Sequence, residues 1–305
     1  MVITVLSGGV GAARLLDALC GAIDPSELTA IVNVGDDLTM HGLTICPDLD
    51  TIMYTLAGLN NRELGWGLAG ESWRVMEELE ALGGEAWFRL GDRDLATHLY
   101  RSQRLGGGAT KTEVTNELCA RLGVRVRLLP VTDDTLATTF DTELGQMSFQ
   151  EYFVRHRHDV AVTAIDVVGA DEATASSEVL EALREASRIV IAPSNPLISI
   201  DPILRVRGIR DLLEQRRDVV VGVSPIIDGH ALKGPADRLL AELGHESSCL
   251  GVLDFYKGLI GTWIIDEADA GRADEVRRRD VDVIVTNTIM SESDNARRLS
   301  AAVLA

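Results

Sequence analysis

A glycine-rich loop near the start of the chain is the first place where the residues could do chemistry. The sequence SGGVGAAR (7–14) follows a short apolar run and leads into a helical pattern. Free backbone N–H groups at the beginning of a helix, together with the helix dipole, bind phosphate groups. Arg14, one turn into the predicted helix, could reach the same phosphate. The alternative is a structural glycine turn with a solvated arginine.

This loop matches neither of the two common phosphate-binding motifs. Read from Gly9, the dinucleotide pattern G-x-G-x-x-G has Arg14 where a small residue is required, and read from Gly8 it fails at Val10. No Gly-Lys-Ser/Thr follows, which excludes the Walker motif. The loop therefore predicts a phosphate ligand without saying which one.

Four aspartates that follow the loop could bind a cation. Asp36 and Asp37 come directly after a predicted strand, and Asp48 and Asp50 lie at the start of a predicted helix. Carboxylates that lie close together repel one another unless a cation sits among them, and Mg²⁺ bound by one or two carboxylates plus substrate phosphates is the natural occupant. As alternatives, Asp48 would be a helix N-cap and Asp36 part of an Asx turn. Asp50, inside the first turn, is harder to explain as a cap.

Charged side chains crowd the sequence WFRLGDRDLATHLYR (87–101). Asp94 and His98 are four residues apart on one predicted helix face, which favours a structural pair. Arg89 and Asp92 lie just before and at the start of this helix. Arg89 could contact an anion, although spacing alone does not single it out.

Two loops in the second half of the chain add polar groups. The sequence APSNPLIS (192–199) brings Ser194, Asn195 and Ser199 to the end of a predicted strand, where they could bind a phosphate or a purine edge, or form an ordinary turn. Lys233 could neutralise a phosphate or be solvated. These loops, like SGGVGAAR and NVGDD, follow the carboxyl ends of predicted strands, where open α/β sheets bind ligands.

The elements between these loops predict a Rossmann-like α/β fold. VITVL (2–6), the helical pattern of residues 10–23 and LTAIVNVG (28–35) make one strand–helix–strand unit. We expect a largely parallel sheet with helices on both faces, formed by residues 1–50 and 156–305. Residues 51–155 would be a mostly helical insertion with a hairpin in LATTFDTELGQMSF. The further predicted strands are VAVTAIDVV (160–168), RIVIAPSNP (188–196), RDVVVGVSP (217–225) and VDVIVTNT (281–288).

The composition excludes several classes of protein. A formal net charge of −18 opposes binding to nucleic acid, since a polyanion would be repelled from most of the surface. No apolar run approaches the length of a membrane span. The four cysteines lie far apart without a C-x-x-C pair, which argues against a disulfide framework and a zinc site. The N-terminus does not read as a signal peptide, and we expect a cytoplasmic protein.

Taken together, these motifs resemble the 2-phospho-L-lactate transferase family of coenzyme F420 biosynthesis. The resemblance runs in order from GGVGAAR through NVGDD, GLTICPDLDTIMYTLAG, WFRLGDRDLATH, FQEYFVR and PSNPLISIDPIL to SPIIDGHALKGPA, and it covers nearly the whole chain. One departure is Ala12, where many relatives carry a third glycine. Alanine is still small enough for a phosphate to approach closely.

The resemblance implies a transferase with a guanosine diphosphate ester as donor. Its phospho-three-carbon-acid group, 2-phospholactyl or phosphoenolpyruvyl, passes to the terminal ribityl hydroxyl of the deazaflavin Fo, and GMP leaves. The residues implied for the guanosine diphosphate are Gly8, Gly9, Val10, Gly11, Arg14, Ser194, Asn195 and Ser199. The family also suggests a homodimer acting on small molecules, with the insertion contributing to the deazaflavin site.

Asp50, Arg89 and Asp92 fall where the family contacts Fo. Asp36 and Asp50 are the predicted Mg²⁺ ligands. Asp50, together with Asp37, is the candidate to orient or deprotonate the attacking hydroxyl.

Two other functions remain as alternatives. A related group with the same opening sheet binds nucleotide-sugars and regulates carbon metabolism, but its members look more like GGGTG followed by ADDGGSSGRLR. Here GDDLTMHGLTICPDLDT stands in that place and favours the transferase. An NAD(P) oxidoreductase is disfavoured by Arg14 in the glycine fingerprint.

Overall fold

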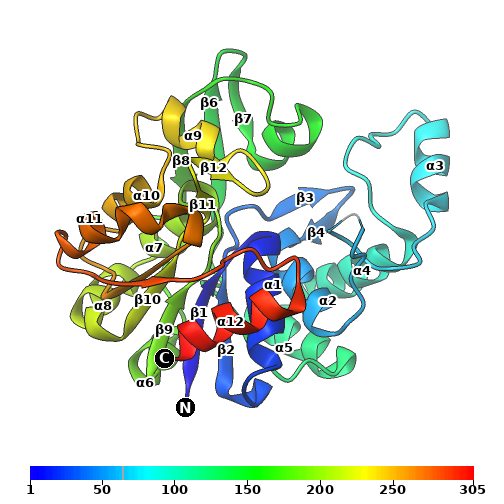
Figure 1. Cartoon of the computed structure of the whole chain (residues 1–305). Coiled ribbons are helices and arrows are strands. Elements are labelled where there is room, and N and C mark those ends of the chain that lie inside the picture. The colour runs from blue at the N-terminus through cyan, green and yellow to red at the C-terminus, as the bar shows by residue number, and fades with distance from the viewer. Residues whose placement is uncertain (64) are drawn as a thin grey trace.

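A seven-stranded parallel sheet forms the centre of the computed structural model, which describes residues 1–63 and 65–305 (Figure 1). Each neighbouring pair of strands runs parallel. The predicted Rossmann-like α/β class is therefore confirmed. In spatial order the strands are β14 (Asp282–Val285), β13 (Thr262–Ile265), β10 (Val220–Val223), β9 (Arg188–Ile191), β1 (Ile3–Ser7), β2 (Leu28–Val32) and β5 (Arg127–Pro130).

The order of the strands reverses at β1. From β1 the chain passes through helix α1 (Gly9–Cys20) to β2 on one side, while β9 pairs with the other side of β1. In open α/β sheets such a reversal leaves a crevice at the carboxyl ends of the two strands, and ligands bind there. β1 and β2 are buried along their whole length, as the continuous apolar runs predicted.

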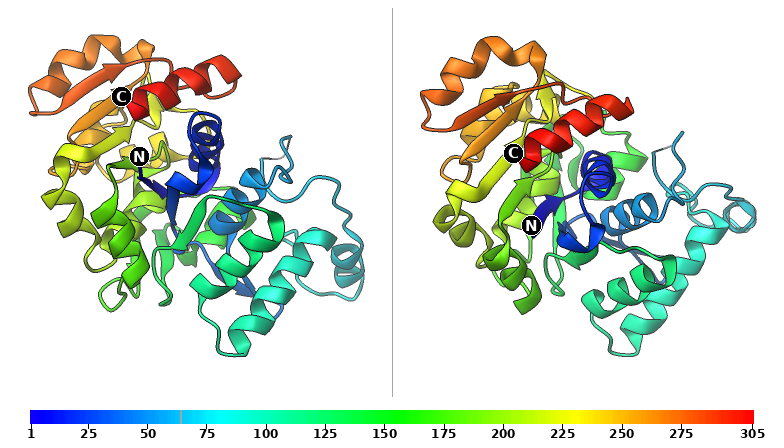
Figure 2. Two further views of the ribbon diagram at one scale, coloured as in Figure 1. Left: turned by 90° about the horizontal axis from the view of Figure 1, so that it is seen from below. Right: turned by 60° about the horizontal axis from the view of Figure 1, so that its bottom comes forward.

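Helices surround the sheet, and α12 packs against α1 in front of it in Figure 1. The left view of Figure 2 shows both helices from below, together with the segment around α3 (Arg74–Ala81), which we call the arm. Within the described residues, no helix combines the length and apolarity needed to cross a membrane. The remaining α-helices are α2 (Pro47–Leu56), α3 (Arg74–Ala81), α4 (Asp92–Gly106), α5 (Lys111–Leu122), α6 (Ser177–Glu185), α7 (Asp201–Arg205), α8 (Ile209–Gln215), α9 (Ala236–Glu242), α10 (Cys249–Phe255), α11 (Ala273–Arg277) and α12 (Ser293–Leu304).

The strand expected at residues 160–168 does not join the central sheet. It forms β8 (Val162–Val168), which pairs antiparallel with β6 (Ala137–Thr142), and β6 pairs with β7 (Gly145–Ser148) in the predicted hairpin. Most of β8 is exposed or half-buried, unlike the strands of the parallel sheet. The apolar run alone did not show whether this strand lies in the buried parallel sheet or in a partly exposed antiparallel sheet. The other small sheets pair β3 (Leu38–Met40) with β4 (Leu43–Ile45) and β11 (Ile226–Ile227) with β12 (His230–Ala231).

The predicted division into a core and an insertion stays a prediction, with one addition from the structure. β5 lies inside the range 51–155 and yet extends the central sheet beside β2. The range therefore supplies a strand of the sheet as well as helices. Near α3, a second small hydrophobic cluster forms apart from the main core, made of Met40, Ile45, Met76 and Leu90.

β13 was missing from the sequence-based prediction, although it carries a large core residue. Trp263 is fully buried and packs over Gly222 of the neighbouring β10. A methyl group on Gly222 would lie 2.6 Å from Cε3 of Trp263 and 2.8 Å from Cδ1 of Ile260. Only glycine leaves room for the indole at this point.

Gly222→Ala is therefore expected to lower the free energy of unfolding by about 1 to 3 kcal/mol, the usual cost of overpacking a core. The measurement is urea denaturation of both proteins. Gly106→Ala, at the exposed end of α4 with open space around the new methyl, is the matched control and should leave stability unchanged or slightly higher. Equal effects at the two positions would contradict the packing argument.

Candidate active site

The glycine loop and the loop of residues 192–199 meet at the carboxyl ends of β1 and β9. A methyl group on Gly8 would lie 2.7 Å from Cβ of Ser199, and one on Gly11 would lie 2.6 Å from the carbonyl oxygen of Pro193. The Ser194 hydroxyl donates a hydrogen bond of 2.7 Å to the carbonyl oxygen of Gly8. The structure thus brings together two motifs that the sequence could only place at strand ends, and it shows why small residues occupy this contact.

Other predicted nucleotide residues shape these loops. The Asn195 side chain accepts a hydrogen bond from the N–H of Leu197 and so caps the turn Pro196–Ile200. Gly9 begins α1 at a φ of +68°, a conformation that favours glycine. Val10 and Arg14 follow in the first turns of α1, both half-buried. The ligand roles predicted for these residues stay predictions.

Asp48 connects the glycine loop to the aspartates. Its Oδ1 accepts a hydrogen bond of 2.6 Å from the N–H of Gly9, so this carboxylate lies at the N-terminus of α1. Its Oδ2 accepts a hydrogen bond of 3.0 Å from Nδ2 of Asn33. One alternative for Asp48 was the N-cap of its own helix, α2, but its carboxylate binds the N-terminus of α1 instead. This contact joins segments 39 residues apart, which helix-capping rules applied to sequence cannot detect.

Asn33 was missed by the sequence analysis, although it opens the NVGDD motif. It is 1% exposed, and its Nδ2 also lies 3.5 Å from Oδ1 of Asp36 and 3.5 Å from the carbonyl oxygen of Ile198. Its Oδ1 accepts a hydrogen bond from the N–H of Gly35. The amide therefore bridges two carboxylates and ties both to the loop of residues 192–199.

Asp36 and Asp48 are buried carboxylates with little charge compensation. Burial, followed by repulsion from Asp48 and Asp37, raises the pKa of Asp36 well above its usual range. Burial also raises the pKa of Asp48 to about 6, although the hydrogen bonds from Asn33 and Gly9 act to lower it. In the described parts of the chain, neither carboxylate has an ion-pair partner within 4.0 Å.

The other two aspartates of the group are paired with cations from neighbouring helices. Asp37 accepts a hydrogen bond of 2.6 Å from Nζ of Lys111, at the start of α5. Lys111 offsets part of the rise that burial causes in the pKa of Asp37. Both oxygens of Asp50 accept hydrogen bonds from the guanidinium of Arg101. The four aspartates thus divide into two paired and two unpaired carboxylates.

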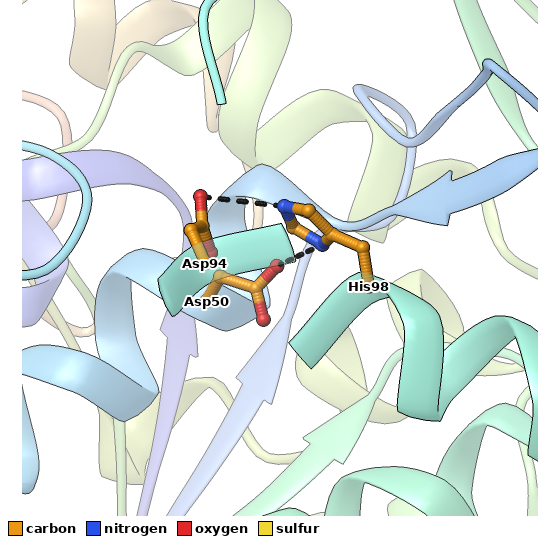
Figure 3. A group of neighbouring side chains, drawn as sticks. All are labelled: Asp50, Asp94 and His98. Atoms are coloured by element: carbon orange, nitrogen blue, oxygen red, sulfur yellow. Dashed lines mark ion pairs between the residues drawn. The ribbon is translucent and has the colours of Figure 1, made fainter. Parts of the chain in front are cut away.

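Asp50 points into a buried network between α2 and α4 (Figure 3). Nδ1 of His98 lies 3.7 Å from Oδ2 of Asp50, and Nε2 lies 3.3 Å from Oδ2 of Asp94, which confirms the predicted pairing of Asp94 with His98. The hydroxyl of Tyr54 donates a hydrogen bond of 2.6 Å to Asp94. Asp50, Asp94 and His98 each offer a ligand atom within 4.8 Å of one another, but Arg101 already supplies a positive charge there.

The structure joins Asp36 to Asp48 through Asn33, and the predicted Mg²⁺ pair of Asp36 and Asp50 stays a prediction. Asp48 and Asp50 are two residues apart on one helix, so their side chains leave it in different directions. The sequence could not decide which of the two shares a site with Asp36.

Arg89 and Asp92 lie at the base of the arm that carries α3. The exposed guanidinium of Arg89 stacks over the ring of Trp73 at 5.0 Å. Asp92 accepts hydrogen bonds from the Ser72 hydroxyl and from two backbone N–H groups at the start of α3, which lower its pKa. Asp92 thus holds the arm in place, and the substrate contacts predicted for both residues stay predictions.

Comparison with known proteins identifies the family. The model of the family described as 2-phospho-L-lactate transferase CofD matches residues 3–303. The chain belongs to the 2-phospho-L-lactate transferase family. It is therefore a transferase of this type, as the sequence predicted.

Similar curated proteins are named phosphoenolpyruvate transferase. The chain is 44% identical to that of Streptomyces griseus over 310 residues, covering 100% of this chain and 98% of the relative. It is 45% identical to that of Mycolicibacterium smegmatis, with 94% of each chain covered. A crystal structure of protein BH3568 from Bacillus halodurans has the same fold, with a TM-score of 0.64, 18% identity and 99% of each chain covered.

Gly8→Ala is expected to reduce transferase activity at least about tenfold, because the methyl would push Ser199 and Asp48 out of a preorganised site. Steady-state kinetics with each substrate varied in turn is the measurement. Gly271→Ala, which has open space around the new methyl, is the control. Unchanged kinetics for a folded Gly8→Ala protein would show that the close approach is not required.

The pKa of Asp48 predicts how stability depends on pH in a chelator-containing buffer. Because its pKa rises from 3.8 to about 6 on folding, the folded state binds this proton more tightly than the unfolded state. The stabilising contribution is complete below pH 3.8 and is lost as the pH rises through about 6. The side chain of Asp48→Asn stays neutral. As the pH rises from about 4 to 7, its free energy of unfolding should therefore gain about 1 to 3 kcal/mol relative to that of the native protein. Urea denaturation across this range tests it, and parallel pH profiles would contradict it.

Proposed function

We propose that this protein transfers a phosphoenolpyruvyl or 2-phospholactyl group from a guanosine diphosphate ester to the ribityl hydroxyl of Fo and releases GMP. Family membership supports the reaction class. The name shared by the relatives, phosphoenolpyruvate transferase, favours the enolpyruvyl donor. The observation that carries the proposal is the convergence of the glycine loop, Asn33 and the Asp36–Asp48 pair at the β1/β9 crevice.

The donor's diphosphate fits this crevice because its walls combine three features. Gly8 and Gly11 let the glycine loop pack closely against the loop of residues 192–199, and the N-terminus of α1, whose first N–H binds Asp48, attracts negative charge. Ser194 and Ser199 flank the same point. Arg14 is the nearby cation on α1 that the sequence offers for the phosphates.

Mg²⁺ fits the carboxylates next to the glycine loop, where Asp48 accepts the N–H of Gly9. Asp36 and Asp48 are buried and lack an ion-pair partner in the described residues, and such a pair is stabilised by a divalent cation. We infer that they hold the ion, with Asp50 as a further candidate from the sequence. When bound, Mg²⁺ would neutralise charge on the diphosphate.

The chain's own residues can then orient the acceptor. The ribityl oxygen attacks the phosphorus that bears the three-carbon acid, the bond from that phosphorus to the bridging oxygen breaks, and GMP leaves with the electron pair. Asp50 orients the hydroxyl and accepts its proton. Asp37, the second candidate from the sequence, is held by Lys111. Arg89 and Asp92 would bind Fo from the arm. Such phosphoryl transfer depends on positioning and on charge neutralisation. A cytoplasmic homodimer completes the proposal.

The test combines direct binding with product analysis. Calorimetry should show that GDP and Fo both bind, that Mg²⁺ strengthens GDP binding, and that Asp48→Asn removes this Mg²⁺ effect. Asp50→Asn and Arg89→Ala should each weaken Fo binding about tenfold or more while GDP binding stays within a factor of two. With the enolpyruvyl donor, mass spectrometry should detect GMP and the phosphoenolpyruvyl ester of Fo. Asp24→Asn, an exposed change, is the control.

Two results would overturn this proposal. Binding of a nucleotide-sugar with no response to Fo would favour the regulatory relatives. Equal loss of GDP and Fo binding in Asp50→Asn would show that Asp50 of α2 is not a specific contact of the acceptor.

A further inference from the structure

Arg101 is a buried cation that the sequence analysis did not single out. It lies on α4, is 2% exposed and donates hydrogen bonds to both oxygens of Asp50. We propose that Arg101 is a positioning residue, which fixes the Asp50 carboxylate in the direction that the acceptor hydroxyl requires. This inference rests on the proposed function, because it takes Asp50 as an acceptor contact.

The guanidinium itself is held from more than one side. Besides the bonds of the guanidinium to Asp50, Nη1 of Arg101 lies 3.2 Å from Nδ1 of His98 and 3.5 Å from the carbonyl oxygen of Thr44. Arginine presents its donors in a rigid plane that matches the two oxygens of a carboxylate. The orientation of the Asp50 carboxylate therefore follows from that of the Arg101 plane.

The ring of His98 lies between Arg101 and Asp94. Because arginine only donates, Nδ1 of His98 must be the acceptor in its contact with Arg101. Nε2 lies 3.3 Å from Oδ2 of Asp94, in contact but without hydrogen-bond geometry. Asp94 in turn accepts the hydroxyl of Tyr54. This chain of contacts runs from α2 through α4 and back to α2, so it anchors Arg101 at both ends.

Asp50 needs such an anchor because of its neighbours. Asp48 is two residues away, and Asp36 and Asp37 lie in the same group of carboxylates. Arg101 binds both oxygens of Asp50 and compensates its charge, which lowers its repulsion with these neighbours. An ionised carboxylate offers about four acceptor positions, so two bonds to Arg101 leave room for a substrate hydroxyl.

The experiment compares two Arg→Lys changes on the same helix. Arg101→Lys keeps the charge and loses the planar fork. Arg104→Lys is the matched control, because Arg104 makes the same kind of paired contact with Glu117 but is 41% exposed in its side chain. Fo and GDP binding are measured by calorimetry, and KM and kcat by steady-state kinetics. We expect Arg101→Lys to weaken Fo binding about 10- to 100-fold while GDP binding stays within a factor of two. Arg104→Lys should change neither.

A purely structural role predicts a different result. Arg101→Lys would then lower the melting temperature while the folded protein kept its affinity for Fo, and that outcome overturns the proposal. If Arg101→Lys does not fold, the Fo binding of His98→Leu and His98→Asn is compared instead. His98→Leu removes the acceptor for Arg101 and should weaken Fo binding, whereas His98→Asn keeps one and should restore most of it. Equal Fo affinity in both would overturn the proposal.

Asp50→Asn, measured in parallel, separates this inference from the proposed function. If Asp50→Asn leaves Fo binding intact, the acceptor role of Asp50 is wrong and the inference falls with it. If Asp50→Asn weakens Fo binding and Arg101→Lys does not, only the positioning role is wrong.

Discussion

The close approach of the glycine loop to the loop after β9 is the constraint on which the site depends. Gly8 and Gly11 lie against Ser199 and the carbonyl of Pro193 with no room for a side chain. This contact exists because β1 and β9 are neighbours in the sheet although 180 residues separate them in the chain. The crevice, the place of the start of α1 and the polar groups of both loops all follow from that pairing.

Charge balance is the second organising principle. Four aspartates lie near the carboxyl ends of the strands, and helices α4 and α5 each place one cation among them. Lys111 and Arg101 compensate Asp37 and Asp50, and this leaves Asp36 and Asp48 joined by the neutral amide of Asn33. Buried charge is costly unless it is compensated, so the two remaining carboxylates define where a cation is favoured.

The sheet and the helices of the middle of the chain both contribute to the surroundings of the aspartates. The end of β1 carries the glycine loop, and α4 supplies Arg101, which binds Asp50. Asp92, at the start of α4, accepts a hydrogen bond from the N–H of Val75 in α3, and Glu71 accepts hydrogen bonds from the N–H groups of Arg93 and Asp94 in α4. These contacts fix the arm with α3 to α4, so the surroundings of Asp50 depend on helix packing as well as on the sheet.

The sequence by itself determined the class of fold and the strand-end motifs, because apolar periodicity and loop chemistry are local properties, and the resemblance of its motifs gave the family. It did not separate β8 from the parallel sheet, because an apolar run does not show whether both faces of a strand become buried, and it missed β13 although TWII is an apolar run of the same kind. Asn33 and Arg101 were beyond its reach, because their roles arise from contacts with partners distant along the chain. Likewise, the direction of Asp48 and Asp50 was decided only when α2 packed between α1 and α4, which turned one carboxylate toward Gly9 and the other toward Arg101.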